Sequence, residues 1–283
     1  MRGAGAVHRI VPDRGSARRR KRKTMTLRGS IGRLAVFGGL CLASLPGRAE
    51  VPANGAVYMD AAYGAVESLM RAKPGTVTLP RLADPVDGRI LADVWNAPAI
   101  LGTAPYTAAS IEALLGIIQK QTQVLQAYLL FSPDPAKQKP DAARNAVEFQ
   151  DELTRSHEFR LKLVAASLQA MNDFGARLTA EEKTDARFQG LRQMRLGLME
   201  IVTGSALALR NPALRPANQL MLARSFSDNA AALAAGIAPL DRKAVIDALQ
   251  AAMPNLKQDA QKAISGFAAT VSAAPCDGLC RLE

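Results

Sequence analysis

The sequence of 283 residues has few of the side chains from which catalytic and metal sites are usually built. It contains two histidines and three cysteines, and aromatic residues make up only 5% of it. His8 lies among the first 49 residues, so His157 is the only histidine of the rest. A metal site with two histidine ligands from this part of one chain is therefore excluded, and the HExxH, GxSxG, P-loop and GxGxxG motifs are absent from the sequence. We expect neither a bound metal nor a cofactor.

The chain also lacks the several long hydrophobic runs of a polytopic membrane protein. Hydrophobic residues nevertheless make up 48% of it, which is too many for a disordered chain. Its 21 glycines and 16 prolines are ordinary numbers at this length and exclude collagen-like and low-complexity proteins. These values are typical of a folded chain, whose length allows one large domain or two small ones.

A basic excess is confined to the N-terminal 49 residues. The whole chain has 36 basic and 25 acidic residues, for a formal net charge of +11. Twelve of the basic residues but only one acidic residue, Asp13, lie in 1–49, so residues 50–283 carry 24 of each sign and no net charge. A strongly basic surface favours nucleic-acid or anionic-membrane partners. Because the body of the chain has no such excess, we expect no nucleic-acid partner.

Residues 34–45 (LAVFGGLCLASL) form an uncharged apolar stretch that follows two arginines and precedes the small residues Gly47 and Ala49. This order is typical of a cleavable secretory signal peptide, and the stretch is too short to span a bilayer. We expect cleavage after Ala49, with the mature protein beginning at Glu50 in the periplasm or outside the cell and having no stable membrane span. An uncleaved anchor and a lipoprotein attached at Cys41 are the alternatives, although the large residue before that cysteine disfavours lipidation.

The basic run 17–23 (ARRRKRK) allows several interpretations. It resembles a nucleic-acid-binding patch or a localisation signal, and paired arginines also occur in twin-arginine export signals. Met25, however, opens a segment with the proportions of an ordinary signal peptide. We therefore interpret residues 1–24 as the product of a translation start placed too early.

The cysteines agree with export. Once the signal peptide is removed, Cys276 and Cys280 remain, an even number that suits an oxidising compartment. Asp277 and Gly278 between them favour a tight turn, so we expect an intrachain disulfide. The closed loop is so short that the bridge contributes only about 2 kcal/mol and fixes the chain end alone. The CxxxC spacing differs from the CxxC of thioredoxin-like sites; free thiols and a redox or metal role are the alternatives.

Proline positions divide the body of the chain. Six prolines lie in residues 50–105, where we expect irregular structure and short helices. In 106–274 the prolines stand at junctions between long blocks rich in strong helix formers, and no segment alternates in the manner of a strand. The sequence therefore predicts an all-α fold. Residues 50–283 are expected to form a single domain, a bundle of about six to seven helices with mostly antiparallel neighbours, ending in a disulfide-linked tail at 275–283.

Apolar stripes place the helices along the chain. Helices are expected at about 55–72, 86–96, 107–131, 141–174 and 180–209, followed by a last one whose stripe is Leu256, Ala260, Ile264, Phe267 and Val271. Two pairs of opposite charge four residues apart are expected to form ion pairs on one helix: Asp151 with Arg155, and Glu158 with Lys162. Thr179 and Glu182 have the spacing of a capping box that opens the next helix.

The helix expected over 180–209 is the most apolar. Glu200 is the only charged residue in 196–209, and a helix that is apolar nearly all round is normally the buried centre of a bundle. Three glycines recur every seven residues along one edge of it: Gly190, Gly197 and Gly204. Because each glycine weakens a helix by about 1 kcal/mol relative to alanine, we expect this edge to allow close approach of a neighbouring helix. A chance spacing is the alternative.

Two polar side chains, Glu200 and His157, are the candidate ligand-binding residues. Leucines flank Glu200 on the helical wheel; if another helix covers that side, the carboxylate is buried and must be paired or protonated. His157 lies on an apolar stripe, where a hydrogen-bonded histidine in the core or between helices is the commonest role. An exposed Glu200, an ion pair between helices, and a catalytic or ligand-binding role at either residue stay open.

These features allow three classes of function. The absence of a catalytic constellation and the neutral body favour a non-enzymatic protein that acts through contacts with a protein partner. Methionine-rich and leucine-rich helix faces favour, as an alternative, a carrier that binds an apolar small molecule in the bundle core. An internal pocket of several hundred Å³ would distinguish the carrier from the interaction protein. A carboxylate-centred enzyme is the third class, and it requires Glu200 and another acid in one cleft.

Overall fold

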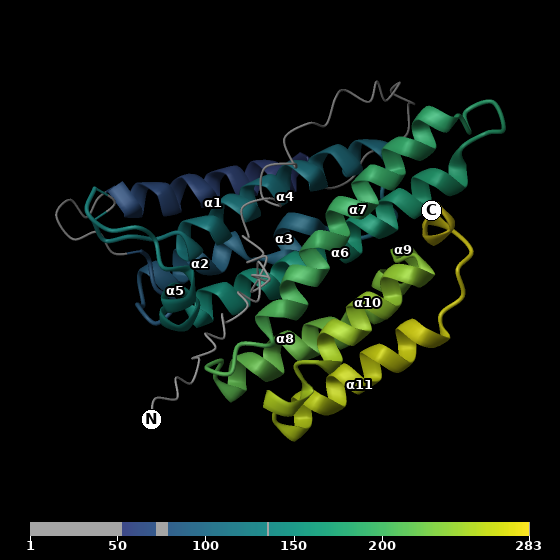
Figure 1. Ribbon diagram of the computed structural model, residues 1–283. Coiled ribbons are helices and arrows are strands. Elements are labelled where there is room, and N and C mark those ends of the chain that lie inside the picture. The colour runs from purple at the N-terminus through teal and green to yellow at the C-terminus, as the bar shows by residue number, and fades with distance from the viewer. Residues whose placement is uncertain (1–52, 72–78, 135, 283) are drawn as a thin grey trace, which may run out of the picture. The chain divides into compact units, whose positions relative to one another are not determined.

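The computed structural model describes residues 53–71, 79–134 and 136–282, and all regular structure among them is helical (Figure 1). The all-α prediction is therefore confirmed. The α-helices are α1 (Ala53–Arg71), α2 (Asp87–Val94), α3 (Ala97–Leu101), α4 (Ala108–Leu129), α5 (Ala142–Glu148), α6 (Gln150–Arg177), α7 (Asp185–Ala208), α8 (Pro216–Asp228), α9 (Ala230–Gly236), α10 (Pro239–Gln250) and α11 (Gln258–Ala273). Two short 3-10 helices are η2 (Met253–Asn255) and η3 (Leu279–Arg281). There are more helices than the six to seven expected, because several are short.

None of the described helices is long and apolar enough to cross a membrane. All the described residues belong to one compact unit, Leu40–Glu283. The signal peptide expected before Glu50, and the early start expected before Met25, lie outside the described residues.

Local sequence signals set where several helices begin. Pro216 and Pro239 occupy the first turns of α8 and α10, where the missing N–H leaves no helical bond unmade. The predicted capping box forms: the N–H of Thr179 donates to the Glu182 carboxylate (3.0 Å), and the N–H of Glu182 donates to the Thr179 hydroxyl (3.3 Å). It closes a turn, however, and α7 begins only after a second cap at Thr184.

The helix expected over 141–174 is divided at Phe149 into α5 and α6. Phe149 is buried, and its ring lies edge-to-face against Tyr128 and Phe131 at centroid distances of 5.4 and 5.5 Å. Such aromatic pairs contribute about 0.5–1.5 kcal/mol beyond the burial of their surface. The break thus places Phe149 against the end of α4.

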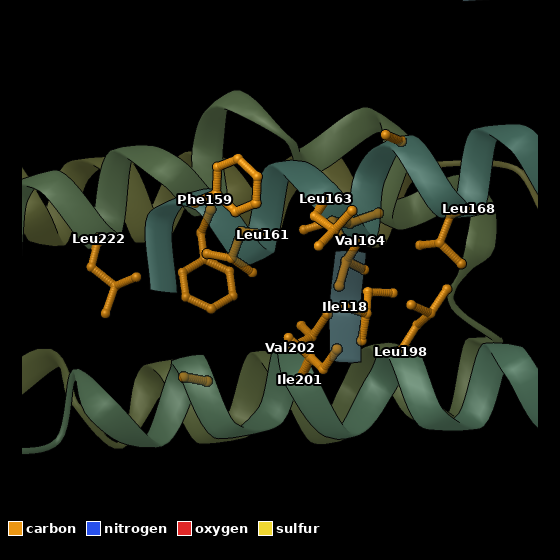
Figure 2. Close-up of a cluster of buried hydrophobic side chains, with 14 of the residues drawn as sticks. Ile118, Phe159, Leu161, Leu163, Val164, Leu168, Leu198, Ile201, Val202 and Leu222 are labelled. Atoms are coloured by element: carbon orange, nitrogen blue, oxygen red, sulfur yellow. The ribbon is translucent and has the colours of Figure 1, made fainter. Parts of the chain in front are cut away.

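α6 is the central helix of the fold. It contacts α4, α7, α8 and α9, and much of its length is buried on most sides. In Figure 2, Val164 and Leu168 of α6 lie opposite Leu198 and Val202 of α7, with Ile118 of α4 beside them. The expectation that the helix over 180–209 is the buried centre is therefore wrong. α6 has polar residues on its buried faces, so the hydrophobicity of its sequence does not indicate that it is the central helix.

The outer side of α7 is exposed along three turns. Leu196 and Leu207 expose 39% and 49% of their surface, and Glu200, Thr203 and Gly204 between them are exposed as well. One face of this helix packs on α6 and α10. The outer face over residues 196–207, which carries the single charge of Glu200, has no covering helix among the described elements.

The predicted glycine edge is not a close helix contact at Gly204. A Cβ atom on Gly204 would meet no atom within 4 Å, and Gly190 and Gly197 are only half-buried. Close approach occurs instead at Gly55 of α1, where a Cβ would lie 1.9 Å from the carbonyl oxygen of Ile100 in α3. Glycines that packing requires therefore lie outside the seven-residue series, at Gly55 and also at Gly236 of α9, where a Cβ would meet the Leu168 side chain of α6.

The predicted disulfide between Cys276 and Cys280 is present, with 5.6 Å between the Cα atoms. The tail that it closes is packed on the fold: Cys280 and Leu279 are buried, and the N–H of Leu279 donates to the Asn172 side chain of α6 (2.8 Å). The bridge is local, as expected, but the tail has its own contacts with the core helices.

Buried arginines hold the same tail. Arg242 of α10 donates from all three guanidinium nitrogens to backbone carbonyls, those of Ala234, Ile237, Ala274 and Pro275. Arg195 of α7 donates to the carbonyl of Leu282 (2.8 Å) and pairs with Asp241 (3.0 Å). Peptide carbonyls at the end of α11 and in the tail therefore obtain donors that the chain end itself does not supply.

Candidate functional site

The two sequence-predicted ligand residues lie in different environments. Glu200 is exposed on the outer side of α7, so the burial considered for its carboxylate does not occur. His157 is buried, and its Nδ1 lies 3.0 Å from the hydroxyl of Ser205 in α7. It is thus a hydrogen-bonded histidine between helices. Neither residue lines either of the two cavities described below.

The His157–Ser205 pair has the composition of a base and a nucleophile, but its environment is that of a structural contact. Ser205 has no exposed surface, and its hydroxyl also donates to the carbonyl of Ile201 (2.9 Å). Burial, with a further contribution from the nearby Arg160 guanidinium, lowers the pKa of His157 from 6.5 to about 3. The imidazole is therefore neutral at physiological pH.

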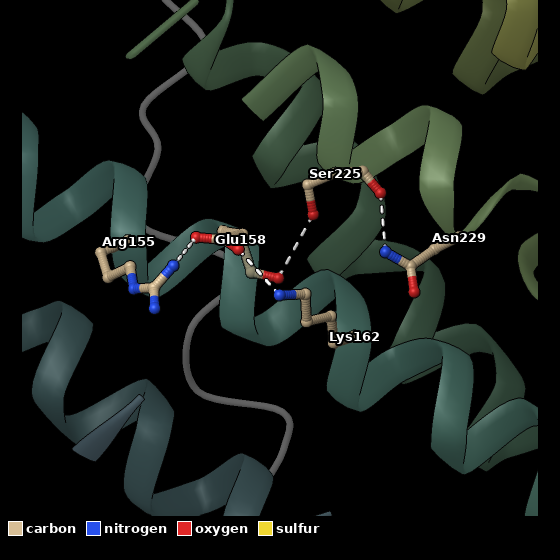
Figure 3. A network of polar contacts seen from close by, with 5 residues as sticks. All are labelled: Arg155, Glu158, Lys162, Ser225 and Asn229. Carbon is tan, nitrogen blue, oxygen red and sulfur yellow. Dashed lines mark hydrogen bonds and ion pairs between the residues drawn. The ribbon is translucent and has the colours of Figure 1, made fainter. Parts of the chain in front are cut away.

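Ion pairs on α6 agree with the sequence in one case. Glu158 pairs with Lys162 (2.8 Å), as expected, and also with Arg155 (Figure 3). Burial alone would raise the pKa of Glu158, but hydrogen bonds and charge from these two cations outweigh it and lower the pKa. The backbone carbonyl of Glu158 accepts a hydrogen bond from Ser225 of α8 (3.3 Å), which ties the two helices together.

The expected pair between Asp151 and Arg155 does not form. Asp151 pairs with Arg215 and accepts a hydrogen bond from Asn218 of α8 (2.8 Å). Burial raises the pKa of Asp151, but these two partners outweigh it, so the pKa is lowered. Asp151 thus has its partners at the start of α8 and not at Arg155 on its own helix, which helix periodicity does not predict.

A cavity of about 620 Å³ lies between residues 79–81 and the chain from the end of α4 to α5. This volume is within the range of small-molecule sites. We call it the Arg81 cavity; its lining combines apolar residues (Leu79, Phe131, Pro133 and Phe149) with basic ones (Arg81, Lys139 and Arg144) and acidic ones (Asp141 and Glu148). A second cavity of about 260 Å³ lies on the other side of Leu79, between α1 and α4. Neither lies among the α6–α7 contacts of the core.

Three side chains position Arg81 at this cavity. The Tyr128 hydroxyl donates to the carbonyl of Pro80 (2.8 Å), the N–H of Arg81 donates to Asp87 (3.2 Å), and the next N–H donates to Glu152 of α6 (2.8 Å). The segment is not helical, so its peptide groups need partners from elsewhere. Bonds from α4, α2 and α6 therefore fix the backbone on both sides of Arg81.

The guanidinium of Arg81 lies over the Phe149 ring, 4.5 Å from its centroid. Its Nη1 is fully buried and has no hydrogen-bond partner. Among the described residues, Arg81 also forms no ion pair. Buried donors are normally hydrogen-bonded, and a buried donor without a partner destabilises a protein by about 1–3 kcal/mol.

Other buried polar atoms of the described chain also lack a partner, so this feature alone does not mark a site. They are Trp95 Nε1, Gln121 Oε1, Ser156 Oγ, Arg160 Nε and Arg195 Nε. None of these residues lines the Arg81 cavity. Arg81 is distinguished because it is the residue of this group that lines the cavity, with its guanidinium against an aromatic ring.

The opposite wall of the cavity is braced from within α5. The Asn145 side chain donates to the carbonyls of Leu129 (3.0 Å) and Phe131 (2.8 Å), which holds the end of α4 against α5. The Asp141 carboxylate accepts from the N–H groups of the first turn of α5. These bonds are made within the protein and leave the cavity itself open.

Sequence reasoning missed this site. Arg81 and the α4–α5 connection are about 50 residues apart in the chain, and neither belongs to a periodic helix face. The only signal is compositional: residues 131–141 combine Phe131 with three prolines and two lysines. Composition of this kind predicts a loop and does not indicate which residues face it.

Comparison with protein-family models, curated proteins and solved structures gives no match. Within the described ranges, no group of three or more His, Cys, Asp or Glu side chains is placed to hold a metal ion.

Proposed function

We propose that the mature chain is an exported, non-enzymatic helical protein, a bundle with mostly antiparallel neighbours, that acts by binding a small molecule in the Arg81 cavity. The observation that carries the proposal is that Arg81, whose guanidinium forms no ion pair or hydrogen bond within the described chain, lines an open volume of about 620 Å³. The site differs from the carrier expected from the sequence, because it lies at the α4–α5 connection, outside the bundle core, and is partly charged.

Small-molecule binding is tested by a thermal-shift screen of organic acids, alcohols and amines against residues 50–283. Gln138 lines the cavity and is exposed, so Gln138→Trp should fill the volume without disturbing the core. Lys137 is next to it but does not line the cavity, so Lys137→Trp is the matched control. We expect ligands that raise the melting temperature of the wild type and of Lys137→Trp but not of Gln138→Trp. A screen without any such ligand would reject the proposal.

Export is supported by the basic and apolar leader and by the disulfide between Cys276 and Cys280, which suits an oxidising compartment. N-terminal sequencing of the protein isolated from the cells that make it should give a chain beginning at Glu50. A cytoplasmic form that retains residues 25–49 would contradict this part of the proposal.

A second candidate function is contact with a protein partner through the outer side of α7. The exposed leucines Leu196 and Leu207, three turns apart on an uncovered helix face, favour it. A photo-crosslinking residue in place of Thr203 should yield one adduct of defined mass in intact cells, whereas the same residue at the exposed Lys262 of α11 should yield none. Equal labelling at both positions would show that the α7 face is ordinary surface.

A further inference from the structure

The charges that line the Arg81 cavity do not cancel. Arg144 pairs with Glu148 (3.5 Å), and Asp141 is engaged by the peptide N–H groups of α5. Arg81 and the exposed Lys139 form no ion pair in the described part of the chain, although the carboxylates of Asp87 and Glu152 accept hydrogen bonds from the peptide N–H groups at Arg81 and the next residue. Two cationic side chains without an ion pair therefore line the same volume, and the charged lining residues sum to one positive charge.

We infer that the Arg81 cavity binds an organic carboxylate with one negative charge and a compact apolar body. This inference rests on the proposed function and names the class of ligand. The carboxylate is bound by the Arg81 guanidinium, with Lys139 as a second cation at the rim. Arginine presents parallel N–H donors that match the two oxygens of a carboxylate, and such charge-assisted bonds are about twice as strong as neutral ones.

The position of Arg81 favours a carboxylate over a neutral polar group. The face of its guanidinium is occupied by the Phe149 ring, so the group offers its edge, where the N–H donors lie, to a ligand. Nη1 has no surface accessible to water, so it does not open into the cavity. The other guanidinium nitrogens form no hydrogen bond within the described chain and are the donors that a carboxylate in the cavity would use.

The other lining residues indicate the polarity and total charge of the part of the ligand beyond its carboxylate. Phe131, Pro133 and Leu79 offer apolar surface close to the basic residues, which suits a hydrocarbon chain or a ring. One carboxylate matches the lining better than a dianion, because the Asp141 carboxylate also faces the cavity and would repel a second negative charge. The combination points to a short-chain or aromatic monocarboxylate.

The test measures binding to residues 50–283 by isothermal titration calorimetry. Benzoate and hexanoate are the carboxylate probes, benzyl alcohol and hexan-1-ol are their neutral counterparts, and inorganic phosphate is the dianionic probe. We expect each carboxylate to bind about tenfold or more tightly than its alcohol, and more tightly than phosphate, since hydrogen bonds between charged groups are stronger than those to a neutral hydroxyl.

Substitutions of Arg81 and Lys139 test whether these residues cause the preference for carboxylate over alcohol. Arg81→Gln removes the charge but keeps a donor, so it should abolish the preference for carboxylate over alcohol while the far-ultraviolet circular dichroism stays unchanged. Lys139→Met should weaken carboxylate binding several-fold. Lys137→Met is the control, because Lys137 carries the same charge two residues away but pairs with Asp134 (3.0 Å) and does not line the cavity. It should leave the affinity unchanged.

The outcomes separate this inference from the proposed function. If the alcohols bind as tightly as the carboxylates and Gln138→Trp blocks both, the cavity is a ligand site but the carboxylate assignment is wrong. Carboxylate binding that survives Arg81→Gln, or tighter binding of phosphate, likewise overturns the assignment. If no ligand of any charge binds in a manner that Gln138→Trp blocks, the proposed function and the inference both fail.

Discussion

Two arginines at different places in the fold, Arg242 and Arg81, use their guanidinium groups in opposite ways. Arg242 gives every guanidinium nitrogen to carbonyls of its own chain and so holds the end of α11 and the tail. Arg81 is fixed by its backbone, while its guanidinium contacts one aromatic ring and donates to nothing in the described chain. Arg242 therefore stabilises the fold, whereas Arg81 lines an open volume.

The comparison sets an arginine whose donors are all used within the protein against one that we propose binds a ligand. Arg242 is buried, whereas Arg81 is half-buried beside the cavity. What separates them is the count of donors used within the chain and the presence of space beside the unused ones. Neither the use of the donors nor the space beside them follows from the sequence.

The most severe test of this comparison is a pair of substitutions, Arg242→Met and Arg81→Gln. Arg242→Met leaves four carbonyls without their donors and should lower the free energy of unfolding by about 3 kcal/mol or more. Arg81→Gln removes only the contact with Phe149 and should lower it by about 1 kcal/mol or less. Urea denaturation measures both. Equal losses would mean that Arg81 is as structural as Arg242.

Two glycine substitutions test whether the close packing of α1 on α3 requires glycine at position 55. Gly55→Ala places a Cβ against the carbonyl of Ile100 and should lower the free energy of unfolding by about 1–3 kcal/mol, since backbone must move. Gly204→Ala, in open space on α7, should raise it by up to about 1 kcal/mol through helix propensity. Urea midpoints that move in the same direction for both would contradict the close approach at Gly55.

The dependence of folding stability on pH tests the burial of His157 in α6, the helix that contacts both the Arg81 segment and the C-terminal tail. The pKa of His157 is lower in the folded state, about 3, than its ordinary 6.5. As the pH falls below 6.5 the unfolded chain takes up a proton that the folded chain refuses, so stability is lost by up to about 1.4 kcal/mol per pH unit. His157→Gln, which does not titrate, should flatten this slope in urea denaturation between about pH 6 and 5. An unchanged slope would mean that His157 is not the responsible group.

Only a modest effect is expected at the disulfide. Replacing Cys276 and Cys280 by alanine should lower the free energy of unfolding by about 2 kcal/mol or less, because the closed loop is short. Arg242 and Asn172 still hold the tail, so the amide of Leu279 should remain protected in hydrogen exchange. Loss of that protection would show that the bridge, and not the arginine, docks the tail.

Several features of the fold could be predicted because their causes are local. Proline at Pro216 and Pro239 marks helix starts, the stripe from Leu256 to Val271 is buried as expected, and Cys276 lies close enough to Cys280 to bond. Each of these depends on residues within a few turns of one another, where spacing and geometry are tightly linked.

The centre of the fold could not be predicted in this way. Hydrophobicity selected the helix over 180–209, but α6 is central although it carries His157 and Glu152 on buried faces. Those side chains are tolerated because Ser205 and the N–H of Leu82 pair with them, and both partners lie far along the chain. The Arg81 cavity is beyond the reach of sequence patterns for the same reason.

The most direct test of the central claim is nuclear magnetic resonance of the Arg81 guanidinium during a titration of residues 50–283 with benzoate. If the cavity holds a carboxylate at Arg81, the side-chain nitrogen signals of Arg81 should shift in a saturable manner, and the benzoate ring protons should show contacts with Phe131. The signals of Arg242 should stay in place, since its donors are already used. Arg81 signals that do not respond, or that respond no more than those of Arg242, would contradict the account.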